Sequence, residues 1–68
     1  MFDCILNIGK ETKELQLERV PQIGEEILFE DVTTNYKVLR VIYSIPLNCY
    51  LIFLEEIDIV KEIIKNNF

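Results

Sequence analysis

The sequence predicts a small, mostly β domain: a five-stranded barrel or a strongly bent antiparallel sheet, followed by a short C-terminal α-helix. Apolar and polar residues alternate over several short runs, and turn-forming residues separate those runs. The apolar positions change parity once within residues 36–45, and helical spacing appears only after residue 57. We therefore expect a single domain over residues 1–68, with the sheet in 1–57 and the helix in 58–68.

The first two strands are predicted to form a β-hairpin. Residues 2–8, FDCILNI, place apolar side chains at alternate positions, and the turn sequence GKET follows at 9–12. Residues 13–20, KELQLERV, then alternate polar with apolar side chains, as a strand with one solvated face does.

Residues 20–30 predict a tight turn and a new strand. Pro21 ends the preceding strand because its φ is fixed, and Gly24 supplies the positive φ that a turn after Ile23 requires. The next strand is expected to start at Glu25 or Glu26, with a polar loop at 30–35 after it. Adjacent strand residues point to opposite faces, so we interpret this Glu pair as turn charges exposed to solvent rather than as catalytic carboxylates.

The stretch YKVLRVIYSIPLNCYLIFLEEI at 36–57 predicts two long strands joined by a turn at Pro46 and Asn48. In its first strand the apolar residues change from even to odd positions. One extra residue in that strand would bring both groups to the same face of the sheet. A β-bulge near Leu39 and Arg40 supplies that extra residue and bends the strand, as in small barrels.

A resemblance supports the same fold. The spacing Pro-x-Ile-Gly-Glu, then a short strand, a polar loop and Tyr-x-Val-x-x-Val-x-Tyr, resembles the small Src-homology-3-like barrels of many short bacterial and phage proteins. The resemblance covers roughly residues 13–57 and implies a fold only, since it carries no catalytic or binding residue.

The C-terminal segment DIVKEIIKNNF predicts a short amphipathic helix with Asp58 as its N-cap. Such a helix needs an apolar surface, and the second face of the 36–57 hairpin is expected to provide it through Leu39, Ile42, Tyr50, Ile52 and Leu54. A helix this short cannot hide both strands, so we expect a homo-oligomer, with a monomer as the alternative. The predicted oligomer interface comprises Ile52, Leu54, Ile59, Ile63, Ile64 and Phe68.

Composition excludes several classes of function. The formal charge is −5, with 12 acidic and seven basic residues, and no basic stripe is present for nonspecific nucleic-acid binding. The chain has no histidine, serine-nucleophile motif, phosphate loop or calcium loop, so we expect no enzyme, no metal and no cofactor. No basic leader precedes a cleavage site and no apolar run spans a bilayer, so a soluble, cytoplasmic protein is expected.

Two binding functions remain. In the first, the chain sequesters a small anionic ligand such as a nucleotide, because aromatic rings stack on bases and guanidinium groups bind phosphates. The candidate ligand-binding residues are Arg19, Tyr36, Lys37, Arg40, Tyr43 and Tyr50. In the second, it is a protein interaction module or inhibitor that docks on another protein through an apolar edge or through its acidic surface, which would face a basic partner, and DNA mimicry is a minor form of this function.

Arg40 has both a structural and a functional interpretation. It lies in the middle of an apolar strand, where it either pairs with a glutamate of a neighbouring strand or reaches an interface or ligand. Short accessory proteins of phages often have one of these two binding functions: they block host proteins or sequester host signals. A phage accessory role for this chain is expected by that analogy.

Cys4 and Cys49 are predicted to be free thiols that pack as small hydrophobic side chains. Reducing agent should therefore leave the melting temperature unchanged, because no disulfide constrains the unfolded chain. A thermal melt with and without dithiothreitol checks this, and a large drop on reduction would contradict it.

Overall fold

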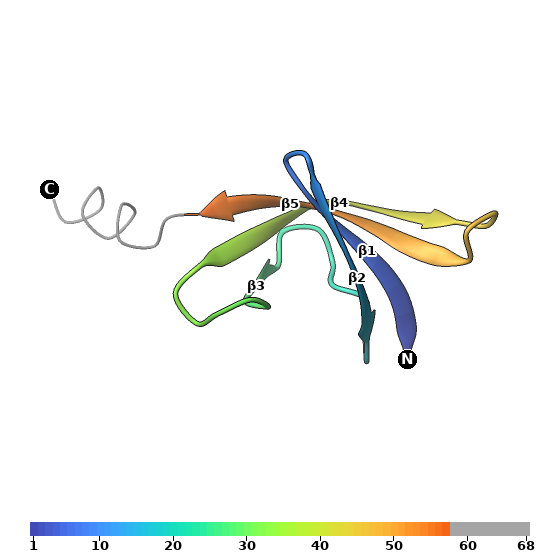
Figure 1. The fold of residues 1–68 in the computed structure, drawn as a ribbon, viewed down its shortest axis with the longest axis horizontal. Helices are drawn as coiled ribbons and strands as arrows, with labels where there is room; N and C mark the ends of the chain where they lie inside the picture. The colour runs from blue at the N-terminus through green and yellow to red at the C-terminus, as the bar shows by residue number, and fades with distance from the viewer. Residues whose placement is uncertain (58–68) are drawn as a thin grey trace, which may run out of the picture.

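A computed structural model describes residues 1–57, which form one curled five-stranded sheet shaped as a half-barrel (Figure 1). The strands are β1 (Phe2–Ile8), β2 (Glu11–Leu17), β3 (Glu26–Ile27), β4 (Asn35–Ser44) and β5 (Cys49–Ile57). Their order across the sheet is β2-β1-β5-β4-β3, so the β1–β2 and β4–β5 hairpins meet at the centre. The mostly β prediction is confirmed.

The first hairpin forms because Gly9 allows a tight reversal. Its φ is 59°, the positive value that a type II′ turn needs at its first central position, and Ile8 pairs with Glu11 directly after the turn. Strand β2 begins and ends earlier than the sequence predicted, at Glu11 and Leu17. Because the turn contains only two residues, the backbone pairing of β2 with β1 already starts at Glu11.

The second predicted turn is also present. Gly24 has a φ of 92°, and the backbone N–H of Glu25 donates to the carbonyl of Gln22 at 3.0 Å. Two bonds then attach the turn to β4: Gly24 N–H to the Val38 carbonyl, and Val38 N–H to the Glu25 carbonyl. Strand β3 has only two residues and is much shorter than expected, so Leu28 and Phe29 fall outside it.

The bulge in β4 is confirmed. Val38 pairs with Leu54 and Arg40 pairs with Phe53, so Leu39 is the extra residue and the register shifts by one. Val38 and Val41 consequently face the same side of the sheet although their sequence parity differs. The β4–β5 turn is held by a hydrogen bond from Asn48 N–H to the Ile45 carbonyl at 3.2 Å, and Asn48 has a φ of 52°.

One pairing differs from the predicted antiparallel sheet. Strands β1 and β5 run parallel, with Leu6 beside Ile52, so the sheet is mixed. Strands β2 and β3 occupy opposite edges and are not paired with each other within residues 1–57. Side-chain contacts link β2 to the segment that follows β3: Lys13 of β2 forms an ion pair with Glu30, and its ammonium lies 5.6 Å from the centre of the Phe29 ring.

The core lies on the concave side of the half-barrel. Its fully buried members come from the two central strands and β4, and the segment between β2 and β3 covers them. The core residues are Cys4, Leu6, Tyr36, Val38, Ile52 and Leu54.

This placement corrects the predicted interface. Ile52 and Leu54 were assigned to the second face of the hairpin, but they are 0% and 5% exposed and pack in the core. Ile52 and Leu54 face the core because β5 pairs in parallel with β1. In that register they lie beside Leu6 and Ile8, on the same face of the sheet. The other interface candidates, Ile59, Ile63, Ile64 and Phe68, lie with the predicted helix outside the described residues.

The assignment of faces predicts different responses to one missing methyl group. Ile52→Val should lower the free energy of unfolding by about 0.5 to 1.5 kcal/mol, because it leaves a cavity in the core. Ile5→Val removes the same group from a half-buried position on the opposite face and should cost less. Urea unfolding of both variants measures the difference, and an equal cost would contradict the assignment.

Candidate functional site

The candidate site is the outer, convex face of the sheet, on the side opposite the core. Strand alternation places four apolar residues there, and the register aligns three of them in a row, with Ile5 and Ile42 on either side of Leu51. Phe53 follows Leu51 on the same strand face. All four side chains are half-buried by their neighbours within residues 1–57. We call Ile5, Ile42, Leu51 and Phe53 the outer apolar row.

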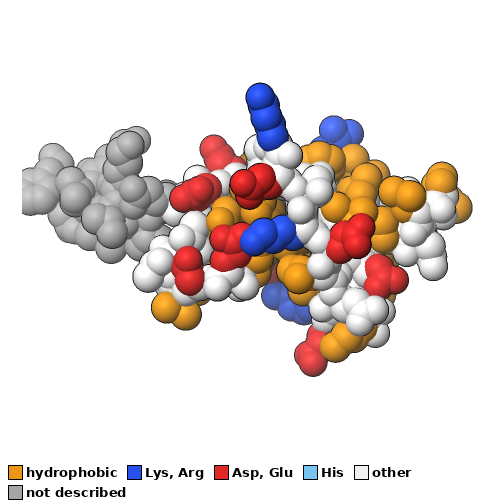
Figure 2. Space-filling model, viewed as in Figure 1, with side chains coloured by type: hydrophobic (Ala, Val, Ile, Leu, Met, Phe, Trp, Pro, Cys, Tyr) orange, Lys and Arg blue, Asp and Glu red, His pale blue; other side chains and the backbone are white. Residues whose placement is uncertain are grey.

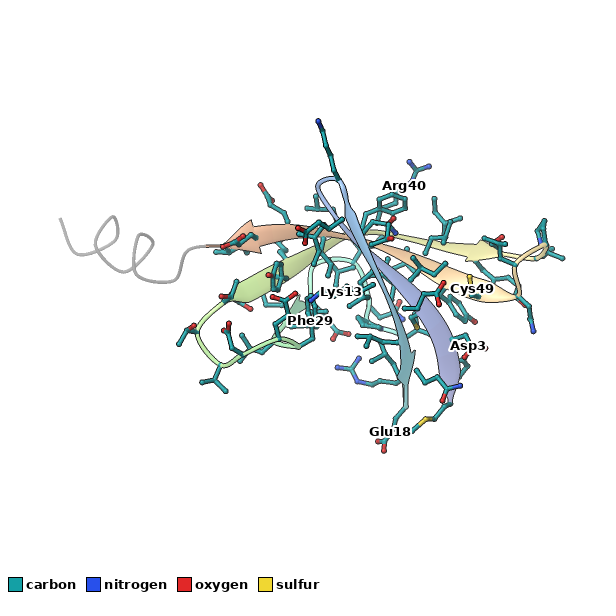
Figure 3. The ribbon with its side chains drawn as sticks, viewed as in Figure 1. Asp3, Lys13, Glu18, Phe29, Arg40 and Cys49 are labelled. Carbon is teal, nitrogen blue, oxygen red and sulfur yellow. The ribbon has the colours of Figure 1, made fainter. Side chains whose placement is uncertain are left out.

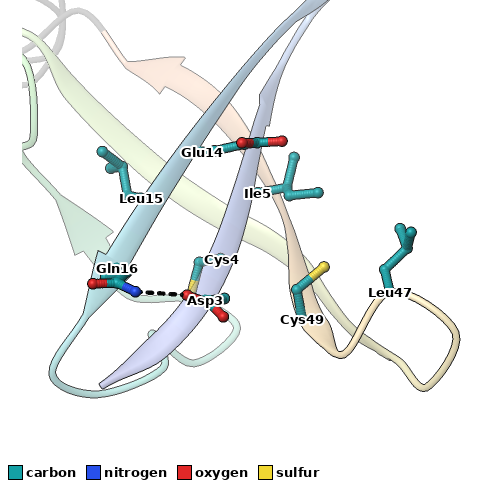
Figure 4. Close-up of a pocket in the computed structure, with 8 residues that line it drawn as sticks. All are labelled: Asp3, Cys4, Ile5, Glu14, Leu15, Gln16, Leu47 and Cys49. Carbon is teal, nitrogen blue, oxygen red and sulfur yellow. Dashed lines mark hydrogen bonds between the residues drawn. The ribbon is translucent and has the colours of Figure 1, made fainter.

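A hollow of about 430 Å³ adjoins one end of this row (Figure 4). Ile5 and Cys49 lie in it, and Leu47 approaches from the β4–β5 turn. Leu47 is 62% exposed, so its side chain is accessible at the side of the hollow. The hollow therefore has the apolar lining of a shallow binding site.

The rim of the hollow on the β1–β2 side is polar and acidic. Asp3 accepts a 3.0 Å hydrogen bond from the side-chain amide of Gln16, and Glu14 lies one alternate position further along β2. Both carboxylates are exposed. The site thus combines an apolar lining with negative charge at one wall, an arrangement that disfavours anions there.

Arg40 projects from the outer face at the bulge (Figure 3). It is exposed, its partner in the register is Phe53, and the ion pairs formed within residues 1–57 do not include it. The expectation of a cross-strand glutamate is therefore wrong for the described part of the chain. A guanidinium beside an aromatic ring and an apolar row is a composition typical of binding hot spots.

Two of the proposed ligand-binding residues make structural contacts. Tyr36 is 4% exposed, and its ring centre lies 4.8 Å from that of Phe29 on the concave side. Arg19 donates two hydrogen bonds to Glu25, of 2.9 and 2.8 Å, in a bidentate ion pair. This pair and a bond from Gln22 N–H lower the pKa of Glu25 from 4.5 to about 2.

The remaining candidates are distributed over two faces. The rings of Tyr43 and Tyr50 pack at a tilt of 47°, with their centres 4.9 Å apart, on the concave face, where the Tyr43 hydroxyl donates to Asn48. Lys37 lies on the outer face between Glu26 and Glu55 of the neighbouring strands. The structure therefore does not bring the six predicted ligand residues together within one copy.

The acidic and sulfur-containing side chains of the described residues form no metal site. No group of His, Cys, Asp or Glu within residues 1–57 is arranged to hold a metal ion. Both cysteines are free thiols and are buried, and burial raises the pKa of Cys4, which disfavours its thiolate. Residues 1–57 contain no helix that could cross a membrane.

Sequence reasoning missed the outer apolar row and the hollow. The signal was the apolar side chains of Leu51 and Phe53 at alternate positions of one strand and of Ile5 in another. Recognising it required knowing that β1 pairs with β5, a contact between the two ends of the described chain. Leu47 had no periodic signal because it lies in a turn.

Comparison with known proteins gives no match to any family model, curated protein or solved structure. The resemblance to Src-homology-3-like barrels stays a prediction, and function must be argued from the surface.

The Arg19–Glu25 pair predicts a measurable titration. Because the pKa of Glu25 is lowered to about 2, the pair stabilises the fold above pH 4.5, and this contribution is lost as the pH falls toward 2. Arg19→Gln should move the Glu25 midpoint up toward 4.5, and Arg19→Lys should move it less. Carbon-13 NMR of the Glu25 carboxyl measures this, and an unchanged midpoint in Arg19→Gln would contradict the pairing.

Proposed function

We propose that this protein is a non-catalytic interaction module that docks on a basic protein through the outer face of its sheet. The observation that carries the proposal is the hollow beside the outer apolar row, with Ile5, Cys49 and Leu47 in its lining and Asp3 and Glu14 at its rim. Blocking or sequestering the docked protein is the mode of action that suits a small domain without catalytic groups.

The hollow matches the chemistry of a lysine or arginine side chain. Such a side chain has an aliphatic stem that packs on apolar surface and a cationic head that stays near water or carboxylates. The stem would lie on Ile5 and Leu47, and the head would reach Asp3 or Glu14 at the rim. The formal charge of −5 adds long-range attraction toward a basic partner.

Arg40 supplies the second anchor. It lies at the opposite side of β5 from β1, across the outer apolar row from the acidic rim. A partner that places an apolar group on Phe53 and a carboxylate against Arg40 would gain a bidentate ion pair. Opposite charges at the two ends of the row would fix the orientation of the partner.

The alternative, sequestration of an anionic nucleotide, has weaker support. It needs several cations and an open aromatic ring at one place. In the described residues Arg19 is held by Glu25, Tyr36 is buried, and Lys37 lies between two glutamates. The negative rim of the hollow would also repel phosphates.

We also infer that the half-barrel is of the Src-homology-3-like type. The bent β4 and the tight turn at Gly24 support this inference, since both occupy the positions that the resemblance implied. This fold class does not fix a function.

Charge reversal on β2 tests the proposal with a built-in control. Glu14 and Glu11 are both exposed on this strand, but the register places Glu14 beside Ile5 on the outer face and Glu11 on the opposite parity. Glu14→Lys should weaken partner binding at least about tenfold, because it puts a cation at the rim that receives one. Glu11→Lys makes the same change in net charge and should alter the affinity by less than about twofold.

The measurement has two steps. Proteins retained by the immobilised wild-type chain, and lost with Glu14→Lys but not with Glu11→Lys, are identified by mass spectrometry. The purified partner is then titrated calorimetrically against all three proteins. Equal weakening by both variants, or a partner whose binding ignores Glu14, would overturn the proposed docking face.

A further inference from the structure

The edge of the sheet at β4 is open over residues 39–44. Strand β3 pairs only with Tyr36 and Lys37, and the Gly24 turn adds two bonds to Val38. Beyond Val38, β4 is paired with β5 on one side, and no other backbone within residues 1–57 bonds to its second side. A strand edge of this kind is a template for another strand.

The direction of the free backbone groups follows from the bulge. The N–H and C=O of Val38 point toward the Gly24 turn and away from β5. Leu39 and Arg40 together oppose Phe53, so both point toward β5, and alternation then turns Val41 and Tyr43 outward. The free donors and acceptors therefore belong to these two residues, whose side chains face the concave side.

The two edges of the sheet differ in their protection against pairing. Along β2, Glu11, Glu14 and Gln16 are exposed, and charged edges resist association. At the β4 edge the exposed side chains are largely apolar: Leu39 and Tyr43 are each 49% exposed, and Ile45 is 79% exposed. Figure 2 shows hydrophobic side chains gathered toward the end of the molecule that holds the β4–β5 turn. Only Arg40 interrupts this edge with charge.

We propose that a second copy of the chain pairs with this edge, β4 against β4 in antiparallel orientation, around a two-fold axis at Ile42. Such an axis is perpendicular to the sheet and keeps both concave faces on the same side. The outward groups of Val41 then bond those of the partner's Tyr43, and the reciprocal bonds form by symmetry. Two half-barrels become one continuous sheet.

The side chains in this register are compatible with self-pairing. Val41 lies opposite the partner's Tyr43 on the concave face, which joins a β-branched with an aromatic side chain, a favourable cross-strand pair. On the outer face Ile42 meets the partner's Ile42, and Arg40 lies opposite the partner's Ser44. No like charges face each other, and the single strand presents the same patch to both copies.

Pairing at this edge also joins the outer apolar rows of both copies, since each row ends at Ile42. The inference goes beyond the proposed function and does not depend on it. Loss of dimerisation and loss of partner binding are separate measurements, because the acidic rim that receives the partner's cation lies on β1 and β2, at Asp3 and Glu14, whereas the dimer edge lies on β4.

Two matched substitutions test the dimer. Ile42 and Ile5 are both half-buried neighbours of Leu51, one on β4 and one on β1. Ile42→Lys puts like charges together at the two-fold axis and should convert the protein from a dimer of the 8.1 kDa chain to a monomer. Ile5→Lys carries the same change away from the edge and should stay dimeric. Sedimentation equilibrium measures the mass, and circular dichroism confirms that both variants fold.

A cross-link provides a second readout that needs no destabilising change. Directly opposed residues of an antiparallel pair lie within the Cα separation that a disulfide spans. Ile42→Cys should therefore give a covalent dimer with copper phenanthroline as oxidant, whereas Ile5→Cys and the wild-type protein should not.

Three results would overturn the inference. The first is a monomeric wild-type protein. The second is loss of the dimer in both lysine variants, which would indicate packing of outer faces. The third is an unaffected dimer in Ile42→Lys without a cross-link in Ile42→Cys, which would assign the contact to another surface, such as one that residues 58–68 provide.

Discussion

The β-bulge at Leu39 is the constraint on which the rest of this structure depends. Without it, Val38 and Val41 would lie on opposite faces of β4, and one half of the strand would leave the core. With it, Tyr36, Val38 and Val41 all lie on the core face of the sheet, beside β5. The same extra residue bends β4, so the sheet curls into a half-barrel around its concave core.

The bulge also determines what remains outside. It brings Arg40 opposite Phe53 and Ile42 opposite Leu51, which completes an apolar row across three strands with a cation at one end. It directs the backbone of Val41 and Tyr43 toward the open edge. The proposed docking face and the proposed dimer edge are therefore two consequences of one local feature, and neither requires a catalytic group.

Local signals in the sequence predicted much of the fold. Gly9 and Gly24 identified two of the turns, because each takes the positive φ that its turn needs, and the parity change between Val38 and Val41 identified the bulge. The parallel contact of β1 with β5 had no local signal, since it joins distant segments. For that reason Ile52 and Leu54 were assigned to the wrong face, and the outer apolar row and the hollow beside Leu47 were not predicted.

The register of β4 against β5 is the central claim, and nuclear Overhauser effects between the two strands measure it directly. The account predicts cross-strand contacts of Val38 with Leu54, of Arg40 with Phe53 and of Val41 with Ile52. An unshifted register would instead place Arg40 opposite Ile52 and Val41 opposite Leu51. Observation of those contacts would contradict the bulge, and with it the assignment of the outer face and the open edge.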